Sequence, residues 1–155
     1  MFAHICTEDF DQQSLYDELL AQSQPTPGAI VTFTGLVRDF NAHGPIEGMS
    51  LEHYPGMTEK ALLNLLEQAT QRFDLAGVGA VHRVGELANF EQIVWVGCGA
   101  SHRQHAFDAA CFIMDTLKQA VPLWKKEYQH GEARWVAVKS SDEHAAMTWL
   151  TPSKN

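Results

Sequence analysis

The chain has 155 residues, of which 45% are hydrophobic and 19% charged, and its formal net charge is −8. This is the composition of an ordinary globular protein, and the acidic balance argues against a nucleic-acid-binding protein, which needs a surplus of Lys and Arg for phosphate contacts. No apolar run approaches the roughly 18–20 residues of a membrane helix, and the first residues do not resemble a signal peptide, so we expect a cytoplasmic protein.

The first half of the chain predicts alternating helices and strands. A helix is expected over 11–22, a turn-rich segment over 23–28 and a strand over 29–34, which puts Arg38 at or just beyond the end of that strand. A polar loop with Gly and Pro follows over 39–48, and then a short strand over 49–54. Thr58 is the expected N-cap of the next helix, whose inward residues are Leu62, Leu65, Leu66, Ala69 and Phe73.

The second half predicts two strands, a long helix and a last strand. The strands are expected over 78–84 and 92–98, the helix over 101–120, and the last strand over 134–139. Ser101 and Gln104 match a capping box, and Pro122 cannot continue the helix. We therefore expect an α+β fold with a mixed or antiparallel sheet packed by helices. It forms a single domain over 1–155, with an N-terminal helix and linker over 1–27 and a polar tail over 151–155.

The long helix carries two features that are typical of an anion site. His102 and Arg103 lie in its first turn, where positive side chains oppose the helix dipole unless an anion binds between them; alternatively, both point into solvent at little cost. Lys118 falls within an apolar stripe at helical spacing, so either its stem reaches a nearby surface or the stripe opens onto a pocket. The stripe is formed by Phe107, Ala110, Cys111, Met114, Leu117 and Val121.

Metal and thiol chemistry is weakly supported. The three cysteines (Cys6, Cys98, Cys111) form no CxxC pair, so we expect small, buried, reduced thiols. His102 and His105 lack a matched carboxylate or a second cysteine, which makes a poor zinc ligand set. A nucleophilic pair of Cys98 and His102 ranks low, because Cys98 lies in an apolar strand. We expect no metal.

Several segments, in one order, resemble the MoaE family, the large subunit of molybdopterin synthase. The segments are 33–38 (FTGLVR), 51–57 (LEHYPGM), 82–87 (HRVGEL), 101–103 (SHR), 112–118 (FIMDTLK) and 122–127 (PLWKKE). The resemblance implies an α/β hammerhead core and a dimer of large subunits, each binding a small ubiquitin-like, MoaD-like carrier whose C-terminal Gly-Gly bears a thiocarboxylate. It also implies sulfur transfer to cyclic pyranopterin monophosphate, with no metal or organic cofactor at this step.

The resemblance also implies roles for individual residues. Lys118 and Lys125 match the catalytic lysines, and Lys139 is the position to examine for a basic residue supplied by the neighbouring subunit. The positions implied for substrate binding are Leu36, Val37, Arg38, His102, Arg103, Lys126 and Glu127. Leu36 departs from the family pattern, which often has lysine there, and so removes one positive group.

Two other functions remain open at this point. A non-catalytic relative could hold a phosphorylated metabolite or a ubiquitin-like tail without chemistry, although binding alone would not need both Lys118 and Lys125. A small metal-dependent hydrolase is the second alternative, and a metal analysis of the purified protein would test it.

Overall fold

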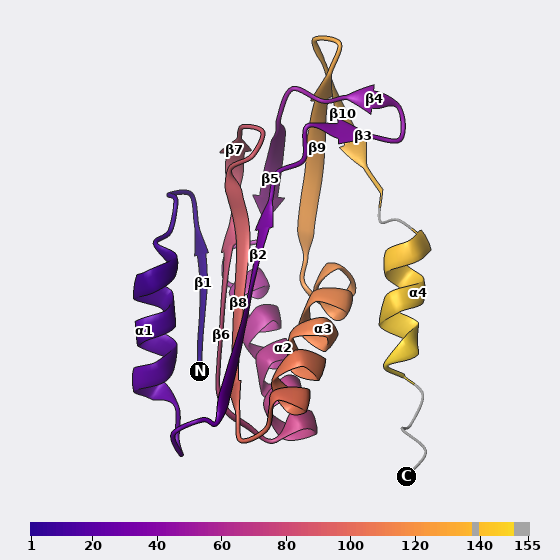
Figure 1. The fold of residues 1–155 in the computed structure, drawn as a ribbon. Coiled ribbons are helices and arrows are strands. Elements are labelled where there is room, and N and C mark those ends of the chain that lie inside the picture. Colours follow the sequence, from indigo (N-terminus) through magenta and orange to yellow (C-terminus); the bar gives the residue numbers. More distant parts are fainter. Residues whose placement is uncertain (138–139, 151–155) are drawn as a thin grey trace.

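A four-stranded mixed sheet forms the centre of the protein (Figure 1). The structure, a computed structural model, describes residues 1–137 and 140–150. In the order β1-β6-β8-β2, the strands are Phe2–Cys6, Leu75–Arg83, Gln92–Ala100 and Ala29–Leu36. β1 runs parallel to β6 and the other pairs are antiparallel, which confirms the predicted mixed sheet.

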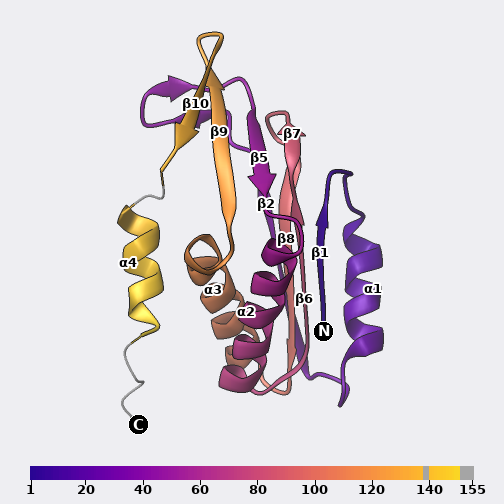
Figure 2. The ribbon, with the colours of Figure 1, turned by 180° about the vertical axis from the view of Figure 1, so that it is seen from behind.

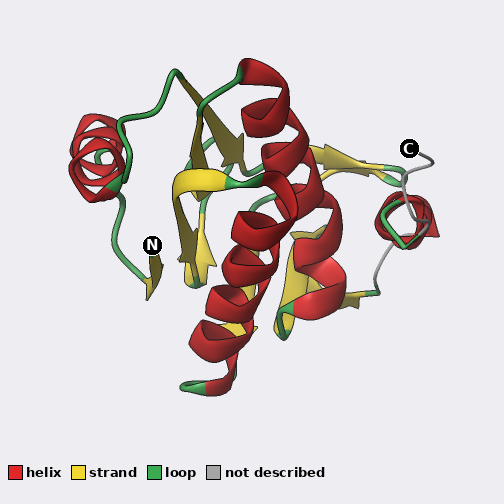
Figure 3. Ribbon diagram, turned by 90° about the horizontal axis from the view of Figure 1, so that it is seen from below, coloured by secondary structure: helices red, strands yellow, loops and turns green. Residues whose placement is uncertain are grey.

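Helices cover both faces of this sheet (Figure 3). α1 (Gln12–Gln22) packs on one face, and α2 (Met57–Phe73) and α3 (Arg103–Ala120) pack on the other. α1 begins as predicted, because the Asp11 carboxylate accepts a hydrogen bond of 2.9 Å from the Ser14 backbone N–H. The main core lies between the sheet and the α2–α3 pair.

A second, antiparallel sheet continues the molecule beyond one end of the first (Figure 1). In the order β10-β9-β5-β7, its strands are Glu132–Val136, Leu123–Gln129, Met49–His53 and Gly85–Leu87. The predicted 39–48 loop contains a small hairpin of β3 (Phe40–Asn41) and β4 (Gly44–Pro45). α4 (Ser140–Thr148), which was not predicted, packs against α3 (Figure 2).

Both predicted N-caps were wrong. α2 begins after Gly56, whose φ of +85° suits glycine, while the Thr58 hydroxyl accepts from the Tyr54 N–H and donates to the Pro122 carbonyl, both at 2.9 Å. Thr58 thus ties α2 to the start of β9. α3 begins one residue later than expected, with His102 at its N-cap and no side-chain capping bond, and the Gln104 amide donates to Asp108.

The predicted inward stripe of α3 was partly wrong. Its buried face is formed by Ala106, Ala109, Ala110, Phe112, Ile113 and Leu117. Phe107 is 56% exposed and Cys111 is also exposed, so only part of the stripe enters the core. Of the thiols, Cys98 is buried as expected and Cys6 only partly so. Within the described part of the chain, no helix is long and apolar enough to span a membrane.

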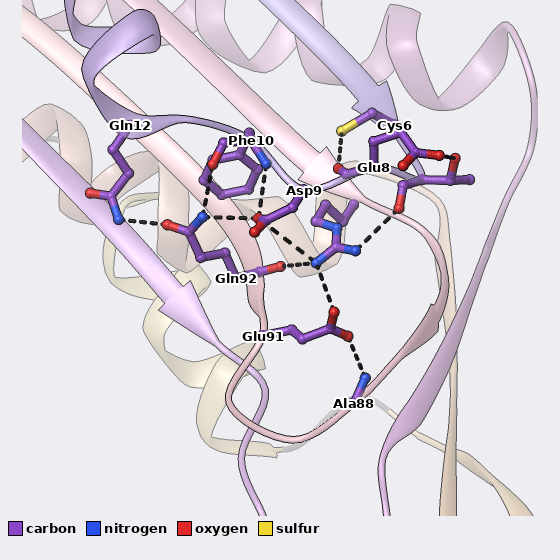
Figure 4. Close-up of polar contacts among 10 residues, drawn as sticks. Cys6, Glu8, Asp9, Phe10, Gln12, Ala88, Glu91 and Gln92 are labelled. Atoms are coloured by element: carbon purple, nitrogen blue, oxygen red, sulfur yellow. Dashed lines mark hydrogen bonds and ion pairs between the residues drawn. The ribbon is translucent and has the colours of Figure 1, made fainter.

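A buried arginine joins three segments of the central sheet at one end. Arg83 closes β6, and its guanidinium donates to the carbonyls of Gln92 (3.0 Å) and Thr7 (3.2 Å). Carboxylate oxygens of Asp9 and Glu91 lie 3.9 and 3.8 Å from its Nη1. Figure 4 shows Asp9 on one segment converging with the adjacent residues Glu91 and Gln92 of another. This network fixes the β1–α1 turn against the start of β8.

Candidate active site

The main cavity, of about 270 Å³, is enclosed by both sheets and the C-terminal end of α3. Its lining has two parts that differ in exposure. The charged part contains Arg38, Lys118, Lys125, Glu127 and Asp142. The deeper part is apolar and almost closed to solvent, with Met49, Leu51, Val94, Leu117 and Val121 each at most 6% exposed. The site is therefore an apolar cavity with a cationic rim.

Strand alternation aims the β9 residues at the cavity. Lys125 is paired with Leu51 of β5 and Val136 of β10, and all three line the cavity. The neighbouring Lys126 points to the opposite face, where its Nζ lies 4.4 Å from the centroid of the Trp135 ring. The predicted role of Lys126 in substrate binding therefore has no geometric support within one chain.

Two lysines and two carboxylates alternate around the rim. Lys118 Nζ lies 2.9 Å from the Asp142 carboxylate, and its side chain is 51% exposed. Lys125 Nζ lies 3.2 Å from Glu127, whose second oxygen accepts a hydrogen bond of 3.0 Å from Asn41. Lys118 is thus a rim residue and does not sit within a buried apolar stripe. The hydrogen bond and the ion pair hold the Lys125 ammonium at one side of the opening.

Arg38 supplies the third cation. It follows β2 and is exposed, and no hydrogen bond or ion pair to it is found among the described residues. Leu36 lines the same cavity, whereas Val37 is 1% exposed within the core and its N–H and carbonyl are bonded to Glu91 and Phe90. Of this predicted trio, Leu36 and Arg38 can face a ligand, but Val37 cannot.

His102 and Arg103 lie at the opposite end of α3 from the cavity. Fifteen residues separate Arg103 from Lys118 in one continuous helix, which is roughly 22 Å at 1.5 Å per residue. Both side chains are exposed, so a single chain does not bring them to the rim. Lys139 lies outside the described residues.

Neither the thiol pair nor a metal site has structural support in the described chain. Burial raises the pKa of Cys98 to about 12, so this thiol is not a nucleophile near neutral pH. His102 and His105 have ring centroids 6.2 Å apart, and no group of three potential metal ligands occurs among the described residues.

Three polar residues that line the cavity were not predicted: Asn41, His82 and Asp142. Asn41 lies in the predicted polar loop, and Asp142 lies in a polar segment for which no helix or strand was predicted, so the sequence offered no signal for them. His82 did carry one, because it is a polar residue that follows an apolar run within its strand. Burial lowers its pKa, which keeps the imidazole neutral.

Comparison with known proteins agrees with this geometry. The family model described as "MoaE protein" matches residues 5–120. The chain belongs to the MoaE family. A relative from Vibrio cholerae named molybdopterin synthase catalytic subunit is 46% identical over 92% of this chain and 93% of its own length. One of the same name from Pseudomonas aeruginosa is 52% identical over 79% of this chain and 81% of its own.

Solved structures extend the agreement to the fold. The MoaE protein from Burkholderia ambifaria superimposes with a TM-score of 0.80 at 43% identity, over 96% of this chain and 98% of that one. The match covers both sheets and the helices around them, so the cavity of this MoaE chain lies within the shared fold.

Proposed function

We propose that this MoaE chain is the catalytic subunit of a cytoplasmic molybdopterin synthase. It transfers sulfur from the C-terminal thiocarboxylate of a small ubiquitin-like carrier to cyclic pyranopterin monophosphate, forming the molybdopterin dithiolene. The observation that carries the proposal is the convergence of Arg38, Lys118 and Lys125 at the rim of one apolar cavity. Relatives named molybdopterin synthase catalytic subunit support the reaction.

The rim cations suit the charges of this reaction. Arg38 has a guanidinium without a partner among the described residues, and its planar donors match a phosphate. Lys118 stabilises the charge that develops as the thiocarboxylate sulfur attacks, or donates the proton that lets oxygen leave. Lys125, held by Glu127, faces the carboxylate end of the carrier tail. Asp142 forms an ion pair with Lys118 in the absence of substrate, and the substrate replaces it.

We further propose that two copies of the chain form a homodimer that completes the site. β2 is an edge strand that packs against α3, and both present apolar side chains to solvent. Phe33, Leu36 and Phe107 are 41%, 53% and 56% exposed. Twofold packing of this surface, with the two α3 helices antiparallel, brings His102 and Arg103 of one copy toward Lys118 of the other. The substrate-binding role expected for both residues then needs the second copy.

The decisive experiment measures molybdopterin formed from cyclic pyranopterin monophosphate and a thiocarboxylated carrier. We expect product from the wild type and a loss of at least about a hundredfold in Lys118→Ala, the scale of removing one transition-state charge partner. The variant should fold, since Lys118 is half exposed and paired only with Asp142. Lys60→Ala, an exposed lysine on α2, is the matched control.

Two results would count against the proposal. If the wild type binds carrier but forms no product, the chain is a binding relative of the enzyme. If Lys118→Ala loses activity together with a large drop in melting temperature, the lysine is structural.

A further inference from the structure

His82 is a buried imidazole in the deep part of the cavity. It lies near the end of β6, on the sheet face that Val78 and Ala80 turn toward α2 and α3. Its register partners are Ile5 of β1 and Val94 of β8. The residue is 8% exposed and lines the cavity beside apolar side chains. A histidine in such surroundings is a polar group that needs partners.

One ring nitrogen has a partner and the other does not. Nδ1 lies 2.8 Å from the Arg83 carbonyl oxygen, which can only accept, so Nδ1 carries the proton. Nε2 of the neutral ring is then an acceptor, and no hydrogen bond to it is found among the described residues. Among the described residues, two side-chain polar atoms are wholly buried and lack a hydrogen-bond partner, namely Arg83 Nε and Asn89 Oδ1. His82 Nε2 also lacks a partner but is not wholly buried, so it retains contact with the open space of the cavity.

We infer that Nε2 of His82 accepts a hydrogen bond from a ring or amino N–H of the pterin of the substrate, and so orients the heterocycle in the apolar part of the cavity. This inference rests on the proposed function. A pterin is flat and carries N–H donors, and a cavity of about 270 Å³ has room for it. The phosphate then lies toward the exposed Arg38 and Lys118.

Among the polar lining groups, His82 combines burial with a free acceptor. Glu127 is also buried, but its two oxygens are occupied by Lys125 and Asn41. The lysines and Arg38 are donors only. A donor on the substrate that enters beyond the rim therefore meets Nε2 of His82. The alternative donor is a backbone N–H of the carrier tail, which the experiment separates from the pterin.

The test compares His82→Leu, which removes the acceptor, with His82→Gln, whose amide oxygen can replace Nε2. Binding of cyclic pyranopterin monophosphate is measured first without carrier, by isothermal titration calorimetry. KM is then measured separately for the pterin and for the thiocarboxylated carrier. We expect His82→Leu to weaken pterin binding and raise its KM about tenfold, the upper range for one neutral hydrogen bond, with the KM for carrier unchanged. His82→Gln should recover most of the loss.

A control variant and several possible results separate the proposed role of His82 from the alternatives. His4→Leu, an exposed histidine on β1, should match the wild type. A raised KM for carrier in His82→Leu, with normal pterin binding, would assign the acceptor to the carrier tail and overturn the inference. Equal losses in His82→Leu and His82→Gln, with lowered melting temperatures, would make the histidine structural. If the wild type itself neither binds pterin nor forms product, the proposed function fails, whereas an active wild type with an unaffected His82→Leu removes this inference alone.

Discussion

Arg83 and the cations of the cavity rim are positive charges in opposite situations. The Arg83 side chain is 7% exposed and donates to two backbone carbonyls that the sheet holds in place. Lys118 and Lys125 are 51% and 32% exposed, and each faces a carboxylate carried on a side chain. Arg38 has no partner in the described chain. Backbone carbonyls cannot leave Arg83, whereas the rim carboxylates can exchange for a substrate anion.

The difference indicates which charges serve the fold and which serve the ligand. A buried guanidinium bonded to fixed carbonyls contributes to stability and has no free donor fork for phosphate. The exposed ammonium group of Lys118, paired with the Asp142 carboxylate, contributes little to stability. His82 and Arg83 are adjacent on β6 and, by strand alternation, face opposite sides of the sheet. One strand therefore separates the structural network from the cavity.

The largest expected effect concerns the cations at the two ends of α3. Arg103→Ala and Lys118→Ala should each be almost inactive alone. If Arg103 acts on the cavity of the second copy, unfolding and refolding an equal mixture should restore about a quarter of wild-type activity, because half of the dimers are mixed and each has one intact site. Refolded single variants are the control. No recovery in a mixture shown to contain mixed dimers would mean that Arg103 does not act on the cavity of the second copy.

The next effect concerns Arg83. Arg83→Met should lower the free energy of unfolding by about 3 kcal/mol, since it leaves the carbonyls of Thr7 and Gln92 without their charged donor. Urea unfolding measures the change, and the exposed Arg134→Met should stay within about 0.5 kcal/mol of the wild type. The folded variant should keep its KM for pterin. A raised KM for pterin with an unchanged free energy of unfolding would mean that Arg83 serves the ligand and not the fold.

Much of the fold could be predicted from local patterns. The helix that starts near Asp11, the β-branched strand beginning at Ala29 and the stop at Pro122 each depend on neighbouring residues, and the structure confirms them. β1 was missed because its five residues become a strand only by pairing with β6, which is distant in sequence. The capping box failed because α3 begins one residue later than expected, with His102 in place of Ser101 at its N-cap.

The site was harder to predict, because helical spacing does not say which face of a helix is covered. Phe107 and Lys118 share the stripe that seemed to point inward, yet both are exposed. Adjacent Lys125 and Lys126 look equivalent in sequence, and only the register of β9 separates them. The distance between Arg103 and Lys118 follows from the helix itself, but the proposal that a second copy completes the site depends on locating the cavity.

The smallest effect follows from the neutral state of His82, which contrasts with the permanent charge of Arg83. Burial lowers the pKa of His82 in the folded chain, so below about 6.5 the unfolded chain binds a proton that the folded chain does not. Stability contributed by this group is therefore complete above that pH and is lost as pH falls toward the lowered pKa. Between pH 7 and 5.5 the loss is at most about 1 kcal/mol.

Urea unfolding of the wild type and His82→Gln at both pH values isolates this contribution. All other titratable groups are common to the two proteins, so their contributions cancel in the difference. We expect the wild type to lose more stability than His82→Gln on acidification. An equal loss would mean that the imidazole is protonated in the folded chain at pH 5.5. Nε2 would then be a donor there, and pterin binding should weaken over the same pH range.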